Sequence, residues 1–294
     1  MNMVDTDTRT VDAPGATVTY DVRRPDGDAT GGRPLMLIGS PMDAAGFGTL
    51  AAHFADRTVV TYDPRGTGRS ARTDGARRTT PEEHADDLRR VIEALGAGPV
   101  DLFASSGGAV NAFALVAGHG ELVATLVAHE PPAARVLPDG EAVLGICEDI
   151  HATYLQKGMG PAMAKFLATV GHKGLFPDDW RDAPAPDPAA FGLPTEDDGS
   201  RDDPLLGQNM IGCTGFRPDT AALRAAPTRV VVAAGKESEG EWPARAAAEI
   251  ARELGTTLTV FPSHHGGFLG GEYGQQGAPE EFARTLRDVL ADAG

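Results

Sequence analysis

Short apolar runs alternate with amphipathic segments along most of the chain. The runs are rich in β-branched and aliphatic residues and end in turn residues, as buried strands do, at residues 33–38, 58–62, 100–104, 122–128, 228–234 and 257–261. Residues 17–23 alternate in the manner of a further strand. Helical patterns fall between or after these strands, at residues 46–55, 81–96, 109–117, 242–254 and 279–293. This alternation predicts an α/β fold with a mostly parallel twisted sheet that helices cover on both faces.

The alternation breaks between residues 132 and 218. Helical patterns at 147–156 and 161–170 are followed there by residues 177–204, which are rich in Pro and Asp. We therefore expect one α/β core, formed by residues 1–131 and 219–294, that is interrupted by a helical lid at residues 132–218. Residues 1–10 are polar and acidic, and we expect them to be mobile.

The charge balance excludes several kinds of partner. The chain has 294 residues, 41% of them hydrophobic, and a formal net charge of −16. A protein this acidic repels nucleic acid and anionic membranes, and no local cluster of Lys or Arg reverses the sign. No apolar run reaches the length of a membrane span. We expect a cytoplasmic protein with neither a nucleic-acid nor a membrane partner; the sequence does not indicate its oligomeric state.

The sequence shows no metal or dinucleotide motif. Cys147 and Cys213 are far apart and lack metal-ligand spacing, so we interpret them as reduced packing residues, with a single long-range disulfide as the alternative. The adjacent His264 and His265 face different ways on an extended segment, which does not suit joint metal binding. No G-x-G-x-x-G motif follows the first strand. We expect no cofactor and no metal.

A serine follows the strand at residues 100–104, in a tight turn before the next helix. Centred on Ser106, the pattern has the small residues Ala104 and Gly108 two positions to either side. Centred on Ser105, one of these positions would hold the bulky Phe103. A nucleophilic serine at such a turn has a strained backbone that only small neighbours tolerate, and its hydroxyl stands clear of the sheet. Ser106 is therefore the candidate nucleophile, although the same pattern also occurs at plain turns.

Four motifs follow predicted strands in a fixed order, at the sheet edge where ligands bind in open parallel sheets. They are Gly39-Ser40-Pro41, the loop at residues 63–70, the serine turn, and His265-Gly266-Gly267-Phe268. Because it carries these four motifs in this order, the sequence resembles the α/β-hydrolase superfamily, in its lid-bearing serine esterase and lactonase-like branch. The resemblance covers nearly the whole chain outside the lid.

The resemblance implies roles for several residues. Ser106 would attack a carbonyl carbon and form an acyl-enzyme, and His265 would act as its base, with His264 as the competing register. The backbone amides of Gly107 and Ser40 would form the oxyanion hole, with Met42 as the fallback for Ser40. Ile38 replaces the histidine that is usual in the family.

The acid of the triad departs from the family pattern. The usual Asp position, three residues after Gly235, holds Ser238. Two alternatives remain open: Glu130, which follows the strand at 122–128, where haloalkane dehalogenases carry their acid, and Glu237. We favour Glu130, with Glu239 as a further alternative. His129 lies beside the site with no assigned role, and we interpret the remaining histidines as solvated or packing residues: His53, His84, His119, His151 and His172.

The function implied by the resemblance is a cofactor-independent serine hydrolase acting on a carboxylic ester, a lactone or a related acyl bond. The lid would select a small, mostly apolar acyl substrate. The alternatives are a C–C bond hydrolase or an acyl transferase or cyclase with the same triad, and a noncatalytic binding protein with this fold. We interpret Asp63 and Arg65 as structural residues that hold the loop at 63–70.

Overall fold

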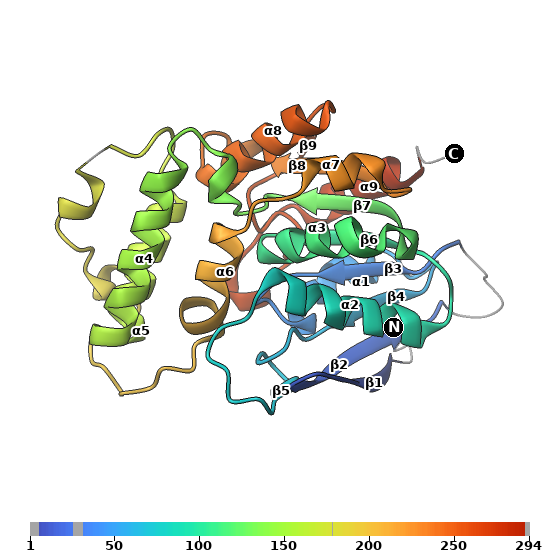
Figure 1. Ribbon diagram of the computed structural model, residues 1–294, viewed down its shortest axis with the longest axis horizontal. Coiled ribbons are helices and arrows are strands. Elements are labelled where there is room, and N and C mark those ends of the chain that lie inside the picture. Colours follow the sequence, from blue (N-terminus) through green and yellow to red (C-terminus); the bar gives the residue numbers. More distant parts are fainter. Residues whose placement is uncertain (1–5, 26–31, 178, 292–294) are drawn as a thin grey trace.

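One sheet of nine strands runs through the part of the chain that the computed structural model describes, which is residues 6–25, 32–177 and 179–291 (Figure 1). The strands are β1 (Thr6–Ala13), β2 (Ala16–Arg23), β3 (Leu35–Ile38), β4 (Val59–Tyr62), β5 (Ala71–Arg72), β6 (Val100–Ser105), β7 (Val123–His129), β8 (Arg229–Gly235) and β9 (Thr259–Phe261). Their order is β1-β2-β4-β3-β6-β7-β8-β9, with β5 beside β2. Pairs from β4 to β9 are parallel, and those of β2 with β1, β4 and β5 are antiparallel. The predicted mostly parallel sheet is confirmed.

Helices cover both faces of this sheet. They are α1 (Gly48–Ala52), α2 (Pro81–Leu95), α3 (Gly107–His119), α8 (Trp242–Leu254) and α9 (Pro279–Ala291). Successive strand residues point to opposite faces, so in β3 Met36 and Ile38 join a core cluster with α2, α3 and α8. Leu35 and Leu37 join a second cluster with α1 and α9. The two clusters place the sheet between two helical layers.

The expectation that residues 1–10 are mobile was wrong for residues 6–10, because strand β1 begins at Thr6. Strand β1 pairs antiparallel with β2 along its whole length, and the two are joined by Pro14 and Gly15. Gly15 has a φ of +74°, which a tight hairpin turn requires. The side chains of β1 are exposed on one face and only half-buried on the other, so the sequence carries no apolar alternation there. Residues 1–5 lie outside the described residues.

The segment 132–218 connects β7 to β8 beyond the carboxyl ends of the strands (Figure 1). It contains α4 (Gly140–Lys157), α5 (Met159–Val170), the π-helix η6 (Pro204–Asn209) and α6 (Met210–Gly215). The short helix α7 (Thr220–Ala225) then leads into β8. Helices α4 and α5 are longer than the predicted helices at 147–156 and 161–170. We call residues 132–218 the inserted segment; its role as a lid remains a prediction.

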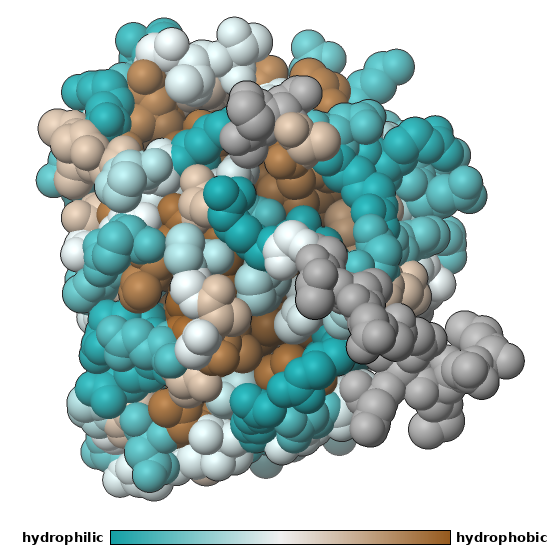
Figure 2. Space-filling view, turned by 90° about the vertical axis from the view of Figure 1, so that its right-hand side faces the viewer, coloured by the Kyte–Doolittle hydropathy of each residue, from teal (hydrophilic) through white to brown (hydrophobic). Residues whose placement is uncertain are grey.

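The opposite end of the molecule presents a mixed surface. Figure 2 shows hydrophilic residues interspersed with hydrophobic ones on the face that is turned away from α4 and α5. No helix among the described residues is long and apolar enough to cross a bilayer.

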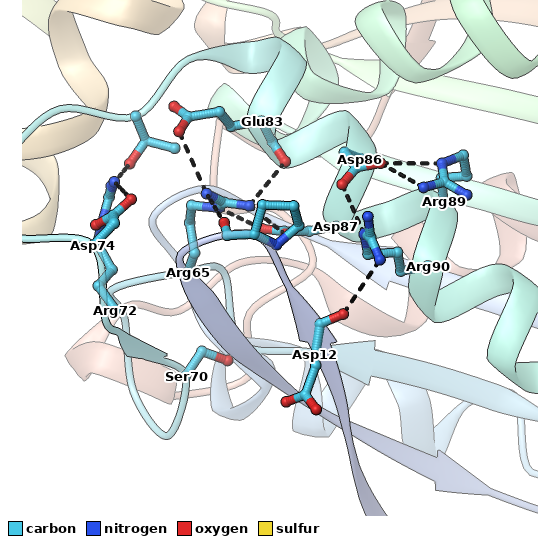
Figure 3. A network of polar contacts seen from close by, with 12 residues as sticks. Asp12, Arg65, Ser70, Arg72, Asp74, Glu83, Asp86, Asp87, Arg89 and Arg90 are labelled. Carbon is cyan, nitrogen blue, oxygen red and sulfur yellow. Dashed lines mark hydrogen bonds and ion pairs between the residues drawn. The ribbon is translucent and has the colours of Figure 1, made fainter. Parts of the chain in front are cut away.

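The loop at residues 63–70 is structural, as predicted. The carboxylate of Asp63 accepts hydrogen bonds from the backbone of Ala44 at 3.1 Å and Arg69 at 2.8 Å. The buried guanidinium of Arg65 binds both oxygens of Asp87 in α2, at 2.7 and 2.6 Å (Figure 3). It also donates to the carbonyl oxygen of Pro14. Arg65 thus ties the loop to α2 and to the β1–β2 hairpin.

We expect Arg65→Met to destabilise the fold by about 3–5 kcal/mol, because it leaves the buried carboxylate of Asp87 without its partner. Arg90→Met is the matched control, since Arg90 pairs with the partly exposed Asp86 of the same helix (Figure 3). Its expected cost is about 0–1 kcal/mol. Denaturant unfolding measures both changes, and equal losses of stability from the two variants would contradict the structural role of Arg65.

Candidate active site

The candidate nucleophile lies on a strained turn between β6 and α3. Ser106 has φ +57° and ψ −129°, a backbone conformation that costs a non-glycine residue about 1–3 kcal/mol. Its amide donates to the carbonyl oxygen of His129 in the neighbouring strand at 2.9 Å. This bond and the helix that begins at Gly107 hold the turn in place. The conformation is the one expected of a serine whose hydroxyl stands clear of a sheet.

The small residues after Ser106 allow close backbone contact with the end of β3. A Cβ atom on Gly107 would lie 2.5 Å from the carbonyl oxygen of Ser40, and one on Gly108 would lie 2.9 Å from the Cα of Gly39. A side chain at either position would therefore force the two segments apart. The structure thus places Gly107 and Ser40, the two predicted oxyanion-hole residues, next to each other.

His265 forms a close pair with Glu130. Its Nδ1 lies 2.5 Å from Oε2 of Glu130, whose other oxygen accepts from the Gly235 amide at 2.7 Å. A carboxylate can only accept, so Nδ1 carries the proton and Nε2 is left free to act as a base. Glu130 directly follows β7, is fully buried and has a φ of +47°. A strained backbone thus directs this carboxylate to the imidazole.

The pKa values of the pair shift in opposite directions. Desolvation raises the pKa of Glu130, but the charge and hydrogen bond of His265 outweigh it and lower this pKa to about 2. Desolvation lowers the pKa of His265, but the charge and hydrogen bond of Glu130 and the charge of Glu241 raise it above the ordinary value. The pair therefore keeps a charged acid beside a histidine of increased basicity.

The other candidate acids lie apart from this pair. Glu237 is exposed, and its backbone amide donates to Ser263 while its carbonyl oxygen accepts from Lys173. Glu239 is exposed as well. Ser238, at the usual Asp position, is buried, and its hydroxyl has no hydrogen-bond partner among the described residues. Of the three glutamates considered, the described contacts bring Glu130 to His265.

His264 is engaged within its own loop. Its Nε2 lies 3.1 Å from the carbonyl oxygen of Gln276, and its Nδ1 accepts from the Gly266 amide at 3.1 Å. The first contact needs a protonated Nε2 and the second an unprotonated Nδ1, so both nitrogens of the neutral ring are used. This arrangement favours His265 over His264 as the candidate base.

His129 lies behind the acid, in the core. It is fully buried between Phe103, Phe261 and Phe282, and burial lowers its pKa to about 4. Its Nδ1 lies 3.4 Å from Oγ of Ser105, and its Nε2 has no hydrogen-bond partner within the described chain. A neutral histidine therefore lies beside the carboxylate of Glu130, with its Nε2 3.9 Å from Oε1.

A cavity of about 380 Å³ opens above the turn, and both Ser106 and His265 line it. Ser40 and Gly107 line it too. Most of the other lining residues are apolar, and the inserted segment supplies several of them: Phe166, Leu167, Val170, Leu205, Met210 and Cys213. Glu241, just before α8, adds a carboxyl group to the wall. Mainly apolar walls around a few polar groups are typical of a small-molecule site.

Asn209 and Glu241 also line the cavity, and the sequence analysis missed both. Asn209 ends the π-helix η6, so it does not follow a strand and belongs to none of the motifs at the strand ends. Glu241 follows the carboxyl end of β8, three residues after Ser238, which holds the usual position of the acid. A search of every polar residue within a few positions of that strand end would have found it.

The cysteines are free and buried, as predicted. Burial raises the pKa of each thiol to about 12, so both stay protonated. Cys213 lines the cavity and Cys147 packs in the core. Across the described ranges, no cluster of three His, Cys, Asp or Glu residues has an arrangement that could hold a metal ion.

The chain is similar to hydrolases both in sequence and in structure. The uncharacterized hydrolase YraK of Bacillus subtilis is 27% identical over 297 residues, which cover 96% of this chain and 95% of that protein. A thermophilic esterase from Thermogutta terrifontis superimposes with a TM-score of 0.66 at 19% identity, covering 98% of this chain and 99% of that one. A meta-cleavage product hydrolase from Pseudomonas fluorescens IP01 gives 0.58 at 15% identity, covering 97% and 98%.

At these identities the two solved structures establish a shared fold. The sequence comparison also shows the family, because the sequence model of the alpha/beta hydrolase family matches residues 35–285. That range begins at β3 and ends in α9, so it includes the serine turn, Glu130 and His265. The protein is a hydrolase, and this chain belongs to the alpha/beta hydrolase family.

Proposed function

We propose that the protein is a cofactor-independent serine hydrolase that cleaves a carboxylic ester, a lactone or a related acyl bond through an acyl-enzyme. The observation that carries this proposal is the meeting of Ser106 and His265 at one cavity, with Glu130 bound to the far nitrogen of the imidazole. A serine hydroxyl is a poor nucleophile near neutral pH, and a neighbouring base that is itself oriented by an acid overcomes this.

In the proposed mechanism, Oγ of Ser106 attacks the carbonyl carbon while Nε2 of His265 takes its proton. The charge of the tetrahedral oxygen is stabilised by the amides of Gly107 and Ser40, whose backbones are in close contact. The imidazolium, held by Glu130, then protonates the leaving alcohol. Water then attacks the acyl-enzyme through the same two steps, with His265 again as the base. The acid product is released and the free Ser106 hydroxyl is restored.

The cavity supports a small and mostly apolar acyl group. Its volume of about 380 Å³ is near the lower end for ligand pockets, and α5 contributes Phe166, Leu167 and Val170 to the walls. In this proposal the inserted segment acts as the lid that selects the substrate. Three further aromatic residues of the inserted segment do not line the cavity: Phe176 and Trp180 pack on each other, and Phe191 is exposed.

A combined assay tests this proposal. We expect turnover of short-chain 4-nitrophenyl esters, and we expect a fluorophosphonate probe to label the peptide that contains Ser106. Ser105→Ala is the matched control, because its hydroxyl faces His129 in the core and should not be the labelled group. An inert chain that the probe leaves unlabelled would favour a binding protein, and label on another residue would refute the assignment of Ser106.

Product analysis separates the remaining alternatives. With an added alcohol, an acyl transferase would yield a new ester in preference to the free acid. A C–C bond hydrolase would turn over a vinylogous diketone faster than simple esters.

A further inference from the structure

A side chain from the inserted segment reaches the candidate oxyanion loop. Asn209, at the end of the π-helix η6, is 1% exposed and lines the cavity. Its Oδ1 lies 3.2 Å from Oγ of Ser40 and 2.7 Å from Nε2 of His84 in α2. Its Nδ2 donates to the carbonyl oxygen of Pro204 at 2.7 Å. One carboxamide thus joins the inserted segment, the segment after β3 and α2.

The direction of each of these hydrogen bonds is determined by chemistry. The Pro204 carbonyl can only accept, so the amide nitrogen of Asn209 faces it and Oδ1 faces the other two partners. Oδ1 can only accept, so Ser40 donates its hydroxyl proton and His84 carries its proton on Nε2. The Nδ1 of His84 is buried and has no partner in the described part of the chain. A neutral ring suits this environment, and burial lowers the pKa of His84 to about 4.

We propose that Asn209 is a positioning residue that holds Ser40, and with it the Ser40 amide, in place to stabilise the oxyanion. This inference rests on the proposed function. The Ser40 backbone is already within contact of Gly107, so a shift of a few tenths of an ångström changes the donor distance to a developing oxyanion. The hydroxyl of Ser40 has its hydrogen bond to Asn209, which fixes the rotamer of the residue whose amide is used.

The backbone around Asn209 supports a dedicated role. A π-helix is rare in proteins and is found frequently at functional sites. Here the π-helix begins at Pro204, whose carbonyl oxygen receives the side chain of Asn209 from the other end of the same element. Asp203 caps the element by accepting from the amides of Leu205 and Leu206. The π-helix therefore fixes the side chain of Asn209, which reaches Ser40.

The test compares Asn209→Ala with the wild-type enzyme on a short-chain ester. We expect kcat to fall by about 10- to 100-fold, less than the 10²- to 10³-fold typical for loss of a whole oxyanion donor, because the amide is displaced and not removed. KM should stay within about threefold, since ground-state binding uses the apolar walls. Affinity for a trifluoromethyl ketone, which places an oxyanion in the hole, should fall in parallel with kcat.

Two variants of His84 probe the same network without altering the cavity wall. His84→Gln offers an amide nitrogen close to the position of the imidazole Nε2, so it should keep the donor to Asn209 and most of kcat. His84→Leu removes the donor and should lower kcat as Asn209→Ala does, with KM unchanged. This pair keeps the inference testable if Asn209→Ala does not fold.

His151→Ala is the matched control. His151 in α4 bonds the carbonyl oxygen of Leu206 in the same π-helix at 2.7 Å but does not line the cavity. It should leave kcat within about twofold. Wild-type kcat and ketone affinity in Asn209→Ala, a loss confined to KM, or an equal loss of kcat in His151→Ala would overturn the inference. If Ser106→Ala instead remains active, the proposed function itself has failed.

Discussion

Ser106→Ala is expected to lower kcat for ester hydrolysis by about 10⁶-fold while the protein stays folded, because it removes the hydroxyl oxygen that forms the acyl-enzyme in the proposed mechanism. His265→Ala should cause a loss of similar size. The double variant should lose little more than either single one, since nucleophile and base act as a unit. Steady-state kinetics on a 4-nitrophenyl ester measures these losses, and thermal unfolding measures whether the fold is retained.

His264→Ala serves as the control for this prediction. Its ring nitrogens bond the loop backbone at Gln276 and Gly266, so its removal should loosen the loop and cost far less rate than His265→Ala. Equal losses from the two histidine variants would show that the register of the motif is wrong. Substantial residual turnover in Ser106→Ala that a fluorophosphonate still inhibits would point to another nucleophile.

The centre of the sheet could be predicted from sequence because β3, β4, β6 and β7 are buried on both faces and read as apolar runs. The predicted strand at residues 228–234 differs from β8 by one residue at each end, and the predicted helix at 242–254 coincides with α8. Strand β1 was missed because its pairing with β2 depends on backbone hydrogen bonds and a Pro-Gly turn, and its side chains alternate between exposed and half-buried. Apolar periodicity reports burial, so it is silent where a strand buries little.

Local neighbours singled out Ser106, and a motif singled out His265, but the choice of acid needed the fold. Glu130 and Glu237 follow the adjacent strands β7 and β8, so both approach the same edge of the sheet. The φ of +47° at Glu130 and the bond from the Gly235 amide turn its carboxylate to His265, and neither can be read from the sequence. Asn209 is a similar case, since its contact with Ser40 spans 169 positions of the chain.

Glu130→Gln should lower kcat by about 10³- to 10⁴-fold, whereas Glu237→Gln should leave it nearly unchanged. A glutamine can present an amide nitrogen to Nδ1 and so favour the wrong tautomer of His265, with the proton on the nitrogen that must act as the base. The carboxylate that stabilises the imidazolium is also lost. Glu237 is exposed and touches its surroundings through its backbone, so it is the matched control.

The pH profile gives this prediction a second readout. The base must be unprotonated in the free enzyme, so kcat/KM should rise with pH, and its midpoint should lie above the ordinary histidine pKa of 6.5 because Glu130 raises the pKa of His265. Glu130→Gln removes that charge and should move the midpoint to lower pH. A large loss in Glu237→Gln, or an unshifted midpoint in Glu130→Gln, would contradict the assignment, because a carboxylate bonded to the imidazole must affect its protonation.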